Sequence, residues 1–175
     1  CYTYYQTYQM RIACLRFFTV YGPRQRPDLA IHKFLTLIGQ GKKVPVYGDG
    51  RQIRDWLFVP DHCQAIDLVL RQGRIGETYC VGGNGERENI WIVEKLLRLL
   101  GKDESSIEYV TDRPGHDRRY AIDFAKIRTE LGWEPSVSLE EGLQETVAWF
   151  QANGEWWQRV KSGTYQEYSL KQYGK

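Results

Sequence analysis

Short apolar segments alternate with amphipathic segments along most of the sequence. The apolar segments have the length and composition of strands, and they lie at residues 11–20, 43–50, 54–59, 77–83 and 106–112. Apolar residues recur at helical spacing in the segments between and after them, at 29–38, 60–70, 89–101, 123–131 and 138–150, while residues 1–10 resemble the tail of a helix. This alternation predicts an α/β architecture.

Two of these segments carry a sharper prediction. Residues 11–20 (RIACLRFFTV) are apolar on both faces, as expected of a central parallel strand. If that strand lacks a neighbour, its edge is unpaired, and we expect the isolated chain to aggregate or to pair through that edge. Ser138 and Glu141 have the spacing of a capping box at the start of a helix.

Composition excludes several classes of protein. The chain has 175 residues, of which 42% are hydrophobic and 26% charged, and its formal net charge is +2, so it has no excess of positive charge that would favour nucleic acid. No apolar run approaches the roughly 18 residues of a membrane span. The four cysteines lack metal-site spacing, so we expect reduced thiols, a cytoplasmic location and no metal. His32 and His62 are predicted to lie on the surface or on a helix face.

Two glycine-rich segments invite comparison with phosphate-binding loops. In GGNGERENI (82–90), between a predicted strand and a predicted helix, Glu88 stands where a third glycine would be needed. The segment YGDGRQIRDW (47–56) precedes a strand rather than a helix, so it also departs from the pattern. We interpret both segments as tight turns, with Asn89 available as a hydrogen-bonding group after the first.

Arginines give the clearest candidates for ligand binding. Arg54 could grip a phosphate with its planar guanidinium, or it could form an ion pair with Asp55, and the residues alone leave both readings open. The segment DRPGHDRRY (112–120) carries three arginines and His116, which suits an oxyanion but also describes a solvated loop. Neither Gly-x-Ser-x-Gly nor Tyr-x-x-x-Lys occurs, so we assign no catalytic residue.

Five separated motifs, in this order, resemble the C-terminal half of the extended short-chain dehydrogenase/reductase family, the NAD-dependent epimerases and dehydratases of nucleotide sugars. The motifs are RFFTVYGPRQRPD, VPVYGDGRQIRDWLFVPDH, GETYCVGG, DRPGHDRRYAID and LGWEP. From residue 42 onward the chain is most similar to the dTDP-glucose 4,6-dehydratase branch. Residues 16–34 look more like the UDP-glucuronate 4-epimerases.

The resemblance implies a nucleotide-sugar-binding lobe plus the last strands of an NAD-binding Rossmann-like domain, with the N-terminal half of the enzyme absent. Residues 1–27 would end the Rossmann-like domain. Residues 28–175 would form mainly the substrate lobe, with some elements returning to the Rossmann sheet. The glycine-rich NAD loop and the catalytic groups would lie in the absent half, so we expect no turnover from this chain alone. Intact relatives are expected to be homodimers.

Site residues follow from the resemblance position by position. The substrate-binding candidates are Thr19, Arg26, Pro45, Tyr47, Arg54, Asn89, Arg113, His116 and Tyr173, and the candidates beside NAD are Phe17 and Phe18. The expected ligand is a nucleotide-diphosphate sugar, and the expected activity of the intact enzyme is dehydration to a 4-keto-6-deoxy sugar. A 4-epimerase, in which Arg26 would meet a sugar carboxylate, and a non-catalytic nucleotide-sugar-binding module are the alternatives.

Overall fold

The computed structural model describes residues 1–162 and 171 of the chain. Its helices are α1 (Tyr2–Tyr8), α2 (Ala30–Gly39), α3 (Val59–Gln72), α4 (Asn89–Leu99), α5 (Ala125–Leu131), α6 (Leu139–Ala152) and α7 (Gly154–Ser162). Its strands are β1 (Cys14–Phe17), β2 (Thr19–Tyr21), β3 (Val44–Tyr47), β4 (Ile53–Phe58), β5 (Thr78–Val81), β6 (Glu86–Glu88), β7 (Ile107–Val110) and β8 (Arg119–Tyr120). None of the described helices combines the length and the apolar composition needed to cross a membrane.

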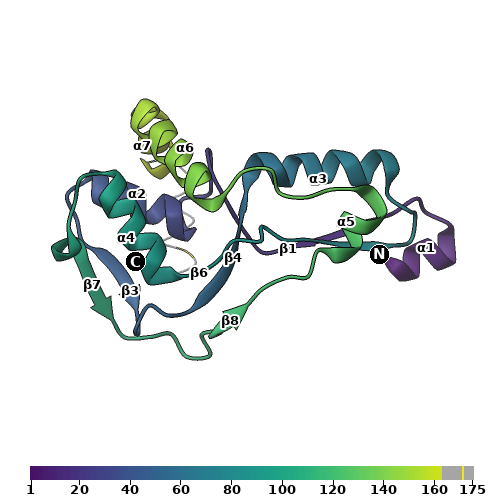
Figure 1. The fold of residues 1–175 in the computed structure, drawn as a ribbon, viewed down its shortest axis with the longest axis horizontal. Helices are drawn as coiled ribbons and strands as arrows, with labels where there is room; N and C mark the ends of the chain where they lie inside the picture. Colours follow the sequence, from purple (N-terminus) through teal and green to yellow (C-terminus); the bar gives the residue numbers. More distant parts are fainter. Residues whose placement is uncertain (163–170, 172–175) are drawn as a thin grey trace.

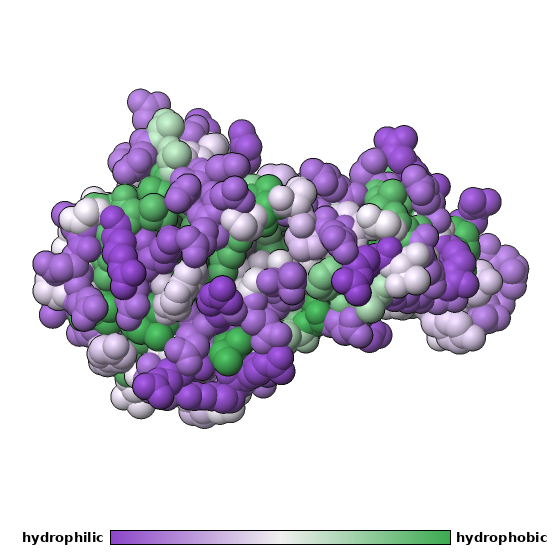
Figure 2. Space-filling view, viewed as in Figure 1, coloured by the Kyte–Doolittle hydropathy of each residue, from purple (hydrophilic) through white to green (hydrophobic). Residues whose placement is uncertain are grey.

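The molecule is elongated, with β4 near its middle (Figure 1). At one end α2 and α4 lie beside the parallel pair β3 and β7, and at the other end α1 and α5 lie near the parallel pair β1 and β5. Strand β4 pairs with β2 and β8 in parallel and with β6 in antiparallel. Figure 2 shows a narrower waist between a larger and a smaller part of the same surface.

Two hydrophobic cores lie on the two sides of β4. Trp56 and Phe58 belong to the first core, which fills the space between α2, α4, α6 and β3. Leu57, which lies between them in sequence, belongs to the second core with Val81 of β5 and other residues of α3 and α5. Because successive side chains of a strand point to opposite faces, β4 serves both cores at once.

The predicted continuous strand over 11–20 is wrong in detail. The chain bends at Phe18, where the Val20 N–H donates to the Phe18 carbonyl at 2.9 Å, and pairing changes from β5 on β1 to β4 on β2. Phe17 and Phe18 are 47% and 42% exposed, so this segment is not buried on both faces. The reason is that β1 pairs with β5 alone among the described strands, which leaves its other edge unpaired.

Most of the other predicted elements are present. The helices predicted at 29–38, 60–70 and 89–101 correspond to α2, α3 and α4. The capping box of Ser138 and Glu141 is confirmed at the start of α6. Strands β6 and β8 were not predicted, because they are only three and two residues long and owe their extended form to pairing with β4.

His32 and His62 lie on helices, α2 and α3, which is one of the two predicted alternatives. The other alternative, a place on the surface, is wrong. His32 is fully buried and His62 is 8% exposed. His32 donates from Nδ1 to the Gln25 carbonyl at 2.6 Å, so it holds the β2–α2 loop, and the His62 ring packs on Phe17 with their centroids 4.2 Å apart. All four cysteines are unpaired thiols.

Candidate functional site

A groove of about 640 Å³ brings together residues from six separate segments of the chain. Eight of the predicted site residues line it: Phe17, Phe18, Thr19, Tyr47, Arg54, Asn89, Arg113 and His116. The other lining residues were not predicted, and they are Val20, Asp28, Leu29, Ala30, Lys33, Phe34 and Tyr120. A smaller polar hollow of about 300 Å³ continues from the groove beneath Arg54 and Arg113.

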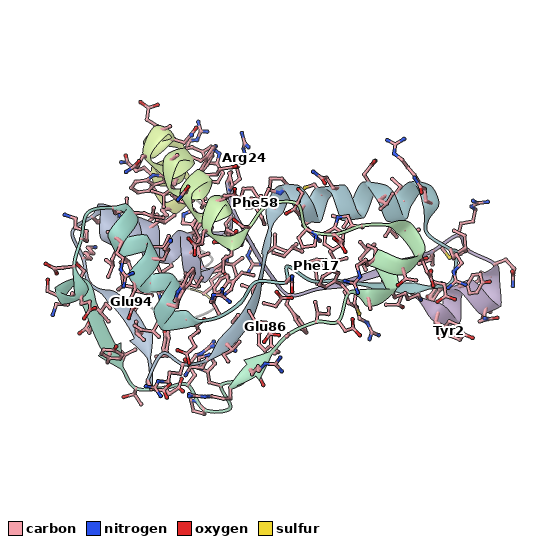
Figure 3. All side chains as sticks on the ribbon, viewed as in Figure 1. Tyr2, Phe17, Arg24, Phe58, Glu86 and Glu94 are labelled. Carbon is pink, nitrogen blue, oxygen red and sulfur yellow. The ribbon has the colours of Figure 1, made fainter. Side chains whose placement is uncertain are left out.

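Each segment reaches the groove at the end of an element. Thr19 follows the bend between β1 and β2, Tyr47 ends β3, and Asn89 begins α4. Figure 3 shows Phe17 near the middle of the molecule, far from Tyr2 at its outer end. Ends of parallel strands and beginnings of helices are where α/β proteins usually bind ligands, since side chains there are held by rigid elements but still face solvent.

Arg54 is a buried cation with little to balance it. The residue is 5% exposed, its Nη1 donates to the Ile53 carbonyl at 2.7 Å, and its guanidinium lies 4.0 Å from the Tyr120 ring centroid. Tyr120 is its neighbour across the β4–β8 pair, which explains the stacking. No carboxylate of the described residues forms an ion pair with Arg54.

The energetic balance at Arg54 favours an anionic ligand. Burying a charge costs several kcal/mol, while a cation–π contact returns about 2 kcal/mol when desolvated. A phosphate or carboxylate in the groove would supply the missing opposite charge, and the guanidinium presents paired donors that match it.

The neighbouring carboxylate, Asp55, is used elsewhere. It points to the opposite face of β4 and accepts hydrogen bonds from the N–H groups of Gly83 at 3.1 Å and Gly85 at 3.0 Å. Burial raises the pKa of Asp55, partly offset by these two hydrogen bonds. The structure therefore decides against the ion pair between Arg54 and Asp55.

These contacts also explain the glycines at 82–85. A Cβ on Gly83 would lie 1.9 Å from the Trp56 carbonyl oxygen, so only glycine allows the turn to pack against β4. The N–H groups of Gly83 and Gly85 are bonded to Asp55 and are not directed at a phosphate. The interpretation of GGNG as a tight turn is confirmed.

The loop 112–118 is fixed by one carboxylate. Asp112 accepts hydrogen bonds from the Arg113 N–H at 2.8 Å, from Gln52 Nε2 at 2.9 Å and from His116 Nδ1 at 2.6 Å. The hydrogen bond from His116 is the main cause that lowers the pKa of Asp112. The His116 side chain is only 5% exposed, so this contact anchors the loop from inside.

The three arginines of the segment 112–120 differ in their charge partners. Arg118 is paired with Asp49 and Arg119 with Glu86, each at 2.8 Å. Arg113 has no such partner among the described residues, and its guanidinium lies 5.5 Å from the Tyr47 ring centroid. Arg54 and Arg113, the two arginines that line the groove, are therefore both without a carboxylate partner among the described residues.

Two of the predicted residues that the structure describes, Pro45 and Arg26, are not brought to the groove. Pro45 lies on β3 but does not line the cavity. Arg26 also lies outside the lining, and its Nε and Nη2 donate to Asp28 at 3.0 and 2.5 Å. Tyr173 lies outside the described residues.

Two missed residues, Tyr120 and Lys33, show the limits of the sequence signal. Tyr120 closes the segment DRPGHDRRY, and its place on a strand beside Arg54 would have identified it, but a two-residue strand leaves no periodic pattern. Lys33 is a polar position of an amphipathic helix, where solvent exposure is the ordinary expectation.

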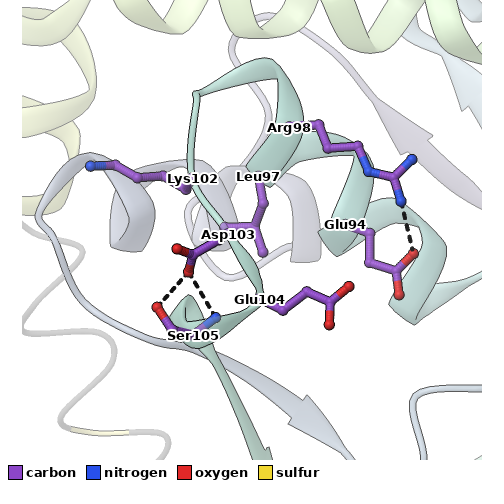
Figure 4. A pocket seen from close by; sticks show the side chains of 7 residues that line it. All are labelled: Glu94, Leu97, Arg98, Lys102, Asp103, Glu104 and Ser105. Carbon is purple, nitrogen blue, oxygen red and sulfur yellow. Dashed lines mark hydrogen bonds and ion pairs between the residues drawn. The ribbon is translucent and has the colours of Figure 1, made fainter.

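A second hollow, of about 470 Å³, lies at the end of α4 (Figure 4). Three of its charged side chains are engaged locally: Arg98 pairs with Glu94 at 3.8 Å, and Asp103 accepts from the Ser105 N–H at 2.9 Å. It contains none of the residues predicted for binding, so the groove is the better candidate site.

Comparison with known proteins identifies the class first. The family described as GDP-mannose 4,6 dehydratase matches residues 1–146, and the chain belongs to this family. The resemblance of the sequence to the NAD-dependent epimerases and dehydratases is thereby confirmed.

Individual relatives are more specific. The chain is 48% identical over 171 residues to dTDP-glucose 4,6-dehydratase of Xanthomonas campestris pv. campestris, an alignment that covers 93% of this chain and 49% of that protein. It is 50% identical over 154 residues to dTDP-glucose 4,6-dehydratase of an Actinoplanes species, with 88% of this chain and 48% of that protein covered. The chain thus spans about half the length of the curated relatives it matches.

Solved structures show the same two branches. The dTDP-glucose 4,6-dehydratase of Bacillus anthracis, in complex with NAD, superposes with a TM-score of 0.86 and 51% identity over 91% of this chain and 51% of that chain. UDP-glucuronic acid 4-epimerase of Bacillus cereus, in complex with UDP-glucuronic acid and NAD, superposes with a TM-score of 0.82 and 31% identity over 87% of this chain and 49% of that chain. The predicted α/β fold is confirmed.

Proposed function

We propose that this chain forms the nucleotide-sugar-binding part of an NAD-dependent dTDP-glucose 4,6-dehydratase, which dehydrates the sugar to a 4-keto-6-deoxy product. One observation carries the proposal: Arg54 and Arg113 face one groove, and neither has a carboxylate partner among the described residues. Two guanidiniums so placed suit the two charges of a diphosphate ester.

The remaining lining residues suit the other parts of such a ligand. The Tyr47 ring, at the end of β3, offers a flat surface for the base, and Pro45 two residues earlier supports the same strand. Asn89 and His116 supply hydrogen-bonding groups to the groove that holds the arginines, and Thr19 offers a hydroxyl to the same groove. Binding energy gathered by this remote part of the substrate would position the hexose for reaction.

The aromatic end of the groove fits a nicotinamide ring. Phe17 and Phe18 are half exposed, and each packs against another ring. Phe17 contacts the His62 ring, and the Phe18 and Tyr120 ring centroids are 4.9 Å apart. These two rings would cover one side of the NAD nicotinamide, which supplies hydride acceptance and return when bound. We propose further that the N-terminal half of the enzyme supplies the contacts to the rest of NAD. We also propose that the intact enzyme is a homodimer with a cytoplasmic location.

Calorimetric titration with dTDP-glucose tests the proposal. We expect the wild-type chain to bind and Arg54→Ala to bind about 10- to 100-fold more weakly, since a hydrogen-bonded charge contact is worth about 1.5–3 kcal/mol. Arg118→Ala is the matched control, because it removes an arginine already paired with Asp49, and it should bind as the wild type does. Equal affinity of Arg54→Ala and wild type would refute the diphosphate site.

A UDP-glucuronate 4-epimerase is the second candidate, favoured by the structural similarity to the Bacillus cereus enzyme. In that case Arg26 would have to exchange Asp28 for the sugar carboxylate. Titration with UDP-glucuronate separates the two, and tighter binding than that of dTDP-glucose would favour the epimerase.

Because the 175 residues contain no Tyr-x-x-x-Lys, we expect no turnover of either ligand by this chain alone; turnover with added NAD would contradict this.

A further inference from the structure

Lys33 is the third cation of the groove. It lies on α2 and lines the cavity, and its Nζ is 6.0 Å from the Tyr47 ring centroid. The Arg113 guanidinium lies 5.5 Å from the same centroid. The two cations therefore face the same part of the groove, although Lys33 and Arg113 are 80 positions apart in the sequence.

The charge of Lys33 is not balanced by the described residues. Within this part of the chain no carboxylate forms an ion pair with Lys33, and Asp28, the acidic residue of the groove lining, is engaged by Arg26. Lys42 and Lys161 add positive charge nearby: the pKa of Lys161 is lowered, first by burial and then by the charges of Lys42 and Lys33. Such a concentration of positive charge favours an anion beside it.

We propose that Lys33 is a third cationic contact for the phosphate chain of the bound nucleotide, acting with Arg54 and Arg113. This inference rests on the proposed function, since it assigns a further residue to the same ligand. A lysine ammonium on a flexible stem suits this role, because it can follow a phosphate whose position is set by the two more rigid guanidiniums.

Binding of dTDP, dTMP and thymidine to the 175-residue chain tests the inference. We expect Lys33→Met to weaken dTDP binding about 3- to 10-fold, in line with a charge-assisted contact of about 1 kcal/mol, and to leave thymidine binding unchanged. Lys33→Arg should retain most of the dTDP affinity. The salt dependence of dTDP binding should also be less steep in Lys33→Met, since one charge contact is gone.

The matched control is Lys43→Met, which makes the same change of charge at an exposed position outside the groove and should leave all three affinities unchanged. Lys33→Met with wild-type affinity for dTDP would overturn the inference. An equal loss for thymidine and dTDP would also overturn it, since the lysine would then act through packing rather than through charge.

The Arg54→Ala variant separates this inference from the proposed function. If Arg54→Ala loses dTDP affinity and Lys33→Met does not, the diphosphate site stands and only the role of Lys33 is wrong. If Arg54→Ala binds dTDP as the wild type does, the diphosphate site itself is wrong, and the inference falls with it.

Discussion

The two faces of β4 treat opposite charges in opposite ways. On one face the buried Arg54 has an aromatic ring and one carbonyl as neighbours but no counter-charge among the described residues. On the other face Asp55 is satisfied by two backbone N–H groups and locks the turn 82–85 onto the strand. Adjacent residues of one strand thus differ in their surroundings: Asp55 stabilises the fold, and Arg54 faces the groove.

The difference teaches how to separate structural from functional charges. A buried charge whose hydrogen bonds are complete contributes to stability, whereas one left without a partner is costly until something binds. The same distinction divides Arg113 from Arg118 and Arg119, which are paired on the outer surface. Three substitutions, at Asp55, Tyr120 and Asp112, test this division between structural and functional charges.

Asp55→Ala should have the largest effect, on stability. It leaves the N–H groups of Gly83 and Gly85 without acceptors in a buried turn, so we expect the free energy of unfolding in urea to fall by about 2–4 kcal/mol. Asp123→Ala is the control, since that exposed carboxylate accepts from one N–H, of Ala125, at 2.8 Å. If the free energy of unfolding falls equally in the two variants, Asp55 is not needed to hold the turn 82–85 on β4.

Tyr120→Leu should have an intermediate effect, on binding. Without the ring the Arg54 guanidinium is less well held, and we expect dTDP affinity to fall by about 1 kcal/mol, or roughly fivefold, in calorimetry. Tyr120→Phe keeps the ring and should bind as the wild type does. If the phenylalanine variant is as weak as the leucine variant, the hydroxyl rather than the stacked ring holds the site together.

Asp112→Asn should have the smallest effect, and that effect should depend on pH. The pKa of Asp112 in the folded state lies below its ordinary value of 3.8. Its carboxylate therefore stabilises the folded chain at pH values above 3.8, and this contribution is lost as the pH falls through the folded-state pKa. The wild type should therefore be more stable than the variant at pH 7.

The difference between the Asp112→Asn variant and the wild type should shrink as the pH approaches 3. Urea unfolding at both pH values measures it. A difference of the same size at pH 7 and pH 3 would show that ionisation of this carboxyl is not its source.

Sequence patterns predicted the regular elements well where they were long. Helices α2, α3, α4 and α6 follow from apolar spacing and from the Ser138–Glu141 capping box. The bend at Phe18 and the short strands β6 and β8 escaped, because each depends on a pairing partner that lies far away in the sequence. Of the ten predicted site residues that the structure describes, eight line one groove, but Lys33 and Tyr120 were found only in three dimensions.

By itself the sequence determined the α/β class, the positions of the main helices and the resemblance to one enzyme family, since periodicity and motifs are local properties of a chain. Only the tertiary structure decided which arginines are balanced by carboxylates and which are not. That decision depends on distances between β4, α2 and the loop 112–118, which fold together from separate parts of the chain. The sequence shows which residues are charged. Which of them are paired depends on how close their side chains lie in the folded chain.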